Sequence, residues 1–164
     1  MDKKIIVMGV SGSGKSTIGE MLGEALDLPY KDGDDLHPQA NIDKMAEGIP
    51  LNDEDRWPWL QLIGEWLEAR PEGAILGCSS LKRSYRDKIR ESAPDAVFVH
   101  VHGDRDLLYS RMSERPGHFM PASLLDSQLE TLEPLQDDES GRVFDIANSP
   151  QDIVDDAATW LRNL

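Results

Sequence analysis

The chain has 164 residues and a net charge of -14, from 17 basic and 31 acidic side chains, with one cysteine, Cys78. This length predicts one domain, residues 1–164, with its own core. The acidic balance argues against nucleic acid as a partner, because phosphates would be repelled. A single cysteine excludes an intrachain disulfide. No apolar run approaches the ~20 residues of a membrane span, and the first expected strand leaves no room for a signal peptide. We therefore expect a cytoplasmic protein with no membrane partner.

The segment Gly9–Thr17 fits the phosphate-binding pattern G-x-x-x-x-G-K-[ST]. The apolar, β-branched run Lys4–Met8 before it predicts a buried strand, and the helical spacing from Ile18 to Leu26 predicts an amphipathic helix. This context matters because loop N–H groups and the helix N-terminus then point into one concavity that holds phosphates. We predict nucleotide binding, with Lys15 at the β- and γ-phosphates and Ser16 on Mg²⁺.

Four further strands and several helices follow in alternation. The strands are predicted at Pro29–Asp32, Ala74–Cys78, Ala96–Val101 and Val143–Ile146. The helices are predicted after a cap at Asn52 or Asp53, over Lys82–Ser92 and Asp104–Ser113, and from Ser149-Pro150 onward. This order predicts an α/β fold with a parallel sheet covered by helices on both faces. Its ligands are expected beyond the carboxyl ends of the strands.

Polar residues follow the second strand. We expect Asp32 and Asp34 to face opposite sides of the segment and therefore assign them different tasks, one near Mg²⁺ and one at an attacking hydroxyl. The alternative is a turn with a helix cap. His37 is expected either at the substrate or as a hydrogen-bonding loop residue. Arg56 is expected to clamp a carboxylate or to pair with its acidic neighbours.

Basic residues gather in two groups, Lys82 to Arg90 and Arg105 to Arg115. They predict either anion binding or a solvated helix face with ion pairs. Between residues 112 and 121, Pro and Gly interrupt the helical pattern, which favours a lid at approximately 112–124. A lid would exclude water and bring positive charge to a transferring phosphate. The alternative is an ordinary loop between helices.

Several segments together carry a family resemblance. They are Gly9–Thr17, Asp32–Pro38, Asn41–Met45, Gly48–Arg56, Cys78–Asp87 and Gly117–Met120. With them the chain resembles gluconate kinases of the thermoresistant gluconokinase type, from the first strand to about Glu133. The resemblance implies a nucleoside-monophosphate-kinase-like P-loop fold with a five-stranded parallel sheet and a lid. It also implies transfer of the γ-phosphate of ATP to the 6-hydroxyl of D-gluconate, and a homodimer.

The same resemblance implies roles for individual residues. ATP and Mg²⁺ would be held by Gly9, Ser11, Gly12, Ser13, Gly14, Lys15, Ser16 and Thr17. Arg111 and Arg115 would serve the phosphates from the lid, with Lys15, Asp34 and Arg115 catalytic. Asp34 would meet the sugar-acid hydroxyl and Asp32 would lie nearer the metal. The substrate would be bound by Asp34, His37, Arg56, Lys82 and Gln128. The turn Asp145–Pro150 would border the adenine, and the acidic segment Leu135–Gly141 receives no role.

Other kinases and one non-enzyme class remain as alternatives. Shikimate kinase would carry a glycine-rich turn where this chain has Cys78-Ser79-Ser80. Adenylylsulfate kinase would share Asp-Gly-Asp but not Leu36-His37-Pro38, and nucleoside monophosphate kinases would place arginines differently. A regulatory nucleotide switch would need Asn-Lys-x-Asp, which the sequence lacks. A catalytically silent phosphate-loop protein also stays open, although Lys15, Ser16 and both aspartates are intact.

Overall fold

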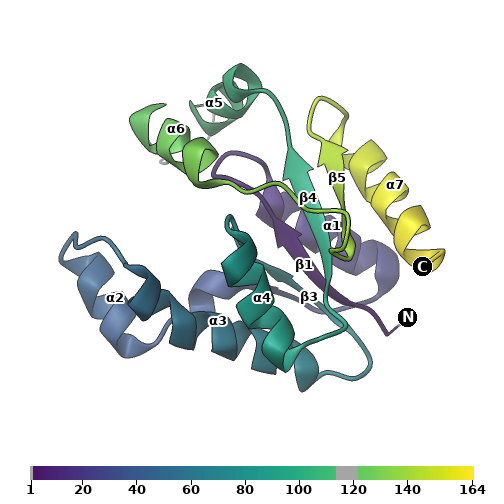
Figure 1. Cartoon of the computed structure of the whole chain (residues 1–164). Coiled ribbons are helices and arrows are strands. Elements are labelled where there is room, and N and C mark those ends of the chain that lie inside the picture. The colour runs from purple at the N-terminus through teal and green to yellow at the C-terminus, as the bar shows by residue number, and fades with distance from the viewer. Residues whose placement is uncertain (1, 114–121) are drawn as a thin grey trace.

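A computed structural model of the chain describes residues 2–113 and 122–164. Within these residues, parallel strands form one five-stranded sheet in the order β2-β3-β1-β4-β5. The strands are β1 (Lys4–Met8), β2 (Tyr30–Asp32), β3 (Ala74–Gly77), β4 (Val97–His102) and β5 (Gly141–Asp145). Because all of them run the same way, their carboxyl ends meet at one edge of the sheet (Figure 1).

Helices cover both faces of the sheet, as predicted. One face packs against α1 and α7, and the other against α3 and α4 (Figure 1). The α-helices are α1 (Lys15–Leu26), α2 (Gln39–Ala46), α3 (Asp53–Glu68), α4 (Arg83–Ser92), α5 (Arg105–Ser113), α6 (Ala122–Thr131) and α7 (Pro150–Arg162), and the short 3-10 helix is η1 (Gly33–Leu36). No helix among the described residues is long and apolar enough to cross a membrane.

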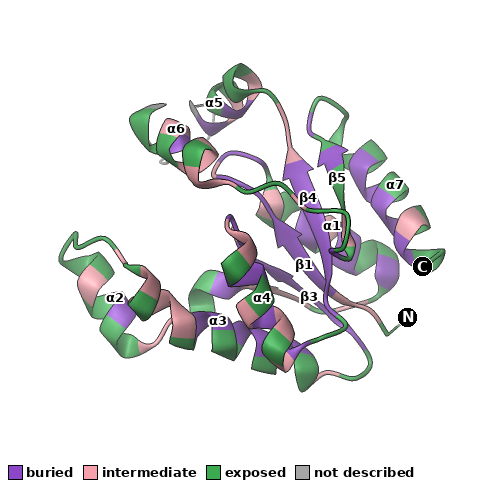
Figure 2. Ribbon diagram, in the orientation of Figure 1, coloured by how far each residue is buried: buried purple, intermediate pink, exposed green. Residues whose placement is uncertain are grey.

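The central strand β1 explains why the core has two halves. Ile5 and Val7 pack with α1 and α7, whereas Ile6 and Met8 pack with α3 and α4. All of them are fully buried, so the middle of the sheet is buried on both sides (Figure 2). A strand buried on both faces has a continuous apolar sequence rather than an alternating one. The run Lys4–Met8 has that character, which is why it could be predicted.

The structure also differs from the predicted elements at several places. It adds η1, α2 and α6, and it chooses Asn52 as the N-cap of α3, in a capping box with Asp55. Both ends of the expected lid, residues 112–113 and 122–124, are helical, and Met112 is buried in the core. The remainder of that segment, including Arg115, lies outside the described residues.

Candidate active site

The phosphate loop, Gly9–Thr17, curls because glycine occupies its left-handed positions. Gly12 and Gly14 have φ values of 83° and 87°, which other residues adopt at a cost. A Cβ on Gly12 would also lie 2.8 Å from the carbonyl oxygen of Leu108. Helix α1 begins directly after Gly14, so no N-cap side chain covers its first-turn N–H groups. Those donors, together with the positive end of the helix, form an anion site.

Two long side chains fold against this loop. The Lys15 ammonium donates to the carbonyl oxygens of Gly9 at 3.0 Å and Val10 at 3.3 Å, which arches the side chain over the concavity. From α6, the Gln128 carbonyl accepts the Ser11 N–H at 2.7 Å, and its amide nitrogen donates to the Ser11 hydroxyl at 3.1 Å. The structure therefore places Gln128, the expected substrate contact, on the phosphate loop.

A cavity of about 550 Å³ opens beside the loop at the carboxyl edge of the sheet. It brings together many of the predicted residues from the loop, β2, β3 and α5. Its lining is Ser11, Gly12, Gly14, Lys15, Ser16, Thr17, Tyr30, Asp32, Asp34, Gly77, Cys78, Ser79, Arg111 and Met112. Phosphate donors and both candidate carboxylates thus share one cavity.

Only the first of the two aspartates is extended, because Asp34 lies on the 3-10 turn that follows β2. Asp32 ends β2, and its carboxylate accepts the Asp34 N–H at 2.9 Å at the start of η1. The expectation that their side chains face opposite sides is therefore wrong, because residues two apart in a strand share a face and here both line the same cavity. Surrounding protein and the Asp32 charge raise the pKa of Asp34. Its side chain remains 79% exposed, so a substrate can reach it.

His37 is held with a defined ring nitrogen toward Asp34. Its ring stacks on Trp59 with centroids 4.2 Å apart, and its Nδ1 accepts the Asn41 amide at 3.2 Å. Nδ1 as an acceptor places the ring proton on Nε2, which lies 3.8 Å from Asp34 Oδ1. Burial lowers the pKa of His37 by more than the Asp34 charge raises it, and the Arg56 charge lowers it as well. The ring is thus neutral at pH 7 and presents an N–H beside Asp34.

Arg56 and Lys82 meet at a group that we name the Tyr85 cluster, made of Asp53, Arg56, Lys82 and Tyr85. Arg56 lies 3.3 Å from an Asp53 oxygen, Lys82 lies 3.8 Å from the other, and the Tyr85 hydroxyl donates to Asp53 at 2.6 Å. Both cations also lie 5.6 Å from the centre of the Tyr85 ring. Two cations against one carboxylate leave one positive charge, which suits a monoanionic ligand group.

A magnesium ion fits this donor set. The described residues hold no group of three or more His, Cys, Asp or Glu side chains that could bind a metal alone. Mg²⁺ in kinases needs no such group, since it keeps several waters and binds one or two protein oxygens together with substrate phosphates. Ser16 and Asp32 line the same cavity, and their side chains carry oxygens that could serve as such ligands.

Comparison with known proteins agrees with this geometry. A family model described as an AAA domain matches residues 5–121. The thermosensitive gluconokinase of Escherichia coli K12 is 47% identical over 154 residues, covering 89% of this chain and 82% of that protein. The chain belongs to the gluconokinase family. A solved gluconokinase of Sinorhizobium meliloti 1021 is 53% identical with a TM-score of 0.89, covering 99% of this chain and 93% of that one. A shikimate kinase of Bacteroides thetaiotaomicron, at 15% identity and a TM-score of 0.74, shares the fold alone.

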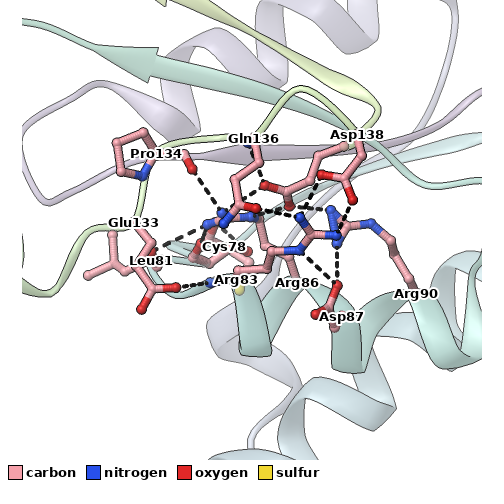
Figure 3. Close-up of polar contacts among 12 residues, drawn as sticks. Cys78, Leu81, Arg83, Arg86, Asp87, Arg90, Glu133, Pro134, Gln136 and Asp138 are labelled. Carbon is pink, nitrogen blue, oxygen red and sulfur yellow. Dashed lines mark hydrogen bonds and ion pairs between the residues drawn. The ribbon is translucent and has the colours of Figure 1, made fainter.

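In this gluconokinase-family chain, most of the basic run after β3 is structural. Arg83 forms a bidentate pair with Asp138 (Figure 3). Arg86 and Arg90 both donate to Glu139. Arg86 is fully buried, and its guanidinium also donates to the carbonyl of Ser80 at 2.9 Å. Burial alone would raise the pKa of Glu139, but these hydrogen bonds outweigh it and hold the pKa below its usual value. The acidic segment, to which the sequence assigned no role, thus anchors α4.

Three site residues escaped the sequence-based predictions. Asp53 and Tyr85 complete the Tyr85 cluster, and Tyr30 lines the cavity. Asp53 looks like an ordinary helix-start residue, and Tyr85 lies inside the basic run. Tyr30 had one usable signal, because it stands two residues before Asp32 and so shares its face of β2. Its ring fits because Gly19 and Gly77 lack a Cβ, which would lie 2.2 and 2.5 Å from the tyrosine atoms.

Proposed function

We propose that this chain transfers the γ-phosphate of ATP to the 6-hydroxyl of D-gluconate, giving 6-phosphogluconate and ADP. The observation that carries the proposal is that Asp34 shares a cavity with the phosphate loop and lies 3.8 Å from His37. His37 in turn is close enough to Arg56 of the Tyr85 cluster for the Arg56 charge to lower its pKa. A hydroxyl at Asp34 and a carboxylate at the Tyr85 cluster are the two ends of a sugar acid. The close gluconokinase relatives support this choice of substrate.

On the donor side, the loop N–H groups, Lys15 and Arg111 hold the triphosphate. Mg²⁺, held by Ser16 and Asp32 together with phosphate oxygens, would neutralise charge on the transferring group. The loop donors are fixed before ATP arrives, since the glycines already set the curvature. Arg115 is proposed to add positive charge from the lid, approximately residues 112–124.

On the acceptor side, Asp34 accepts the proton of the 6-hydroxyl while that oxygen attacks the γ-phosphorus and ADP leaves. Its raised pKa makes the carboxylate a better proton acceptor than an ordinary aspartate. The His37 Nε2–H orients a neighbouring oxygen of the substrate. Arg56 and Lys82 bind the carboxylate, and a neutral sugar would leave that charge unpaired. Gln128, which forms two hydrogen bonds with Ser11, is proposed to contact the substrate from α6.

Identification of the product tests the proposal. We expect the purified chain, given Mg·ATP and D-gluconate, to form a phosphate ester whose phosphorus couples to the C6 protons in a ¹H–³¹P NMR spectrum. An ester on another carbon would contradict the placement of the 6-hydroxyl at Asp34. ADP formation without any ester would mean that water, not gluconate, is the acceptor.

Further proposals concern the oligomeric state, the compartment and the partners of the enzyme. We propose a homodimer in the cytoplasm with no nucleic-acid partner. Light scattering on the purified chain, of 18.3 kDa, tests the first statement, because the monomer and the dimer differ twofold in mass. Fractionation of the source cells tests the second.

A further inference from the structure

Lys82 occupies a position that is unfavourable for lysine. It is the N-cap of α4, with extended φ and ψ of -99° and 146°. N-cap positions favour Ser, Thr, Asp or Asn, because a side-chain oxygen there accepts a first-turn N–H. A lysine ammonium has donors only, and it adds positive charge to the positive end of the helix. The start of α4 must therefore find an acceptor elsewhere.

Glu133 supplies that acceptor from another part of the chain. Its carboxylate accepts the Arg83 N–H at 2.9 Å across a separation of 50 residues, and its own N–H donates to the Leu81 carbonyl at 2.7 Å (Figure 3). The two bonds hold the backbone on both sides of Lys82. The capping carboxylate also places negative charge at the helix start, where it is favourable.

We propose that Glu133 is a positioning residue that caps α4 from outside the helix, so that a lysine can stand at its N-cap and face the substrate carboxylate. The Lys82 ammonium reaches Asp53 at 3.8 Å and lies over Tyr85. A serine or aspartate at position 82 would cap the helix but would remove that cation. The inference rests on the proposed role of Lys82 in binding D-gluconate.

The test compares Glu133→Ala with Glu133→Gln, using D-gluconate and ATP as the varied substrates. If Lys82 loses through its displacement the free energy that a cap typically supplies, the affinity for D-gluconate falls about five- to tenfold. We expect Glu133→Ala to raise the KM for D-gluconate by about that factor, with the KM for ATP unchanged. Glu133→Gln should stay near wild type, because its amide oxygen still accepts the Arg83 N–H. Glu130→Ala, which removes an exposed carboxylate from α6, is the matched control.

A double variant tests whether the contribution of Glu133 to stability is that of a helix cap. In Glu133→Ala, the further change Lys82→Ser supplies a local cap, so we expect the Tm to recover while the KM for D-gluconate stays high. If Glu133→Ala is too unstable to assay, Glu133→Asp, with its shorter reach, is measured in the same way. A lowered Tm with an unchanged KM for D-gluconate would overturn the inference. Lys82→Ala tests the proposed function separately, since an unchanged KM there would remove the carboxylate role of Lys82 whatever Glu133 does.

Discussion

Asp34 has two properties that belong to a catalytic base, a raised pKa and an exposed carboxylate. A protonated aspartate cannot accept the proton of a hydroxyl. The rate should therefore be full above the raised pKa and should be lost as the pH falls through it. We predict that kcat has an acidic limb, that Asp34→Asn lowers kcat by about 10²- to 10⁴-fold, and that the limb then disappears. Equilibrium binding of ATP should not change; a defect confined to ATP affinity would move Asp34 to a nucleotide role.

Arg56 contacts both Asp53 and Tyr85, and a planar guanidinium can hold a carboxylate with two parallel hydrogen bonds. Lysine cannot bind in that way, although it keeps the charge. We predict that Arg56→Lys raises the KM for D-gluconate by about tenfold, the equivalent of one charge-assisted hydrogen bond. Steady-state kinetics with saturating ATP measure this. An unchanged KM would make Arg56 a surface partner of Asp53.

At the scale of elements, the packing of α4 against the acidic segment Leu135–Gly141 depends on a buried ion pair between Arg86 and Glu139. The side chains of Arg86 and Glu139 are fully buried, whereas the Asp138 side chain that pairs with Arg83 is 68% exposed. Removing one partner of a buried pair leaves the other charge unpaired in the core. We predict that Glu139→Ala lowers the free energy of unfolding by about 3–5 kcal/mol. Asp138→Ala, the matched control, should cost about 0–1 kcal/mol. Equal losses in urea titrations would show that burial does not govern this network.

Predictability from the sequence also differed from element to element. Strand β1 and helices α1 and α7 have apolar patterns of the correct period, and they were predicted. Helix α2 was missed because it lacks an apolar stripe facing the core, since Asn41 is buried while Ile42 and Met45 are about half exposed. The Glu139 and Glu133 contacts join residues about 50 positions apart, and no local pattern reports such contacts.

At the scale of the whole molecule, the buried His100 should make the stability of the fold sensitive to acid. It lies in the central sheet, is 1% exposed, and neither ring nitrogen has a hydrogen-bond partner among the described residues. Burial, together with the smaller effects of the nearby His102, Arg86 and Lys15, lowers the pKa of His100 to about 4. The unfolded chain therefore binds more protons between pH 6.5 and about 4, so stability is complete above pH 6.5 and is lost as the pH falls.

We predict that the free energy of unfolding is lower at pH 5 than at pH 7.5 by about 2 kcal/mol from this residue. Urea titrations at the two pH values measure the difference. His100→Leu fills a similar apolar space without a titrating group, so most of the difference should disappear in that variant. The same pH dependence in His100→Leu would assign the acid sensitivity to carboxylates instead.

The fold and much of the site were predictable because the phosphate loop fixes a strand, a helix and a ligand at once. The parallel order of strands then places the other polar strand ends at the same edge. The relation between Asp32 and Asp34 was not predictable, because a 3-10 turn of four residues leaves no periodic pattern. The partners of Arg56 and Lys82 were not predictable either, since Asp53 resembles a helix cap.

The most direct test of the proposed reaction is a coupled ADP-release assay with Mg·ATP and four acceptors in parallel, D-gluconate, shikimate, adenylylsulfate and AMP. We predict turnover with D-gluconate alone, because adenylylsulfate and AMP have no carboxylate for the Tyr85 cluster and shikimate has no primary hydroxyl to place at Asp34. Turnover with another acceptor and none with D-gluconate would contradict it.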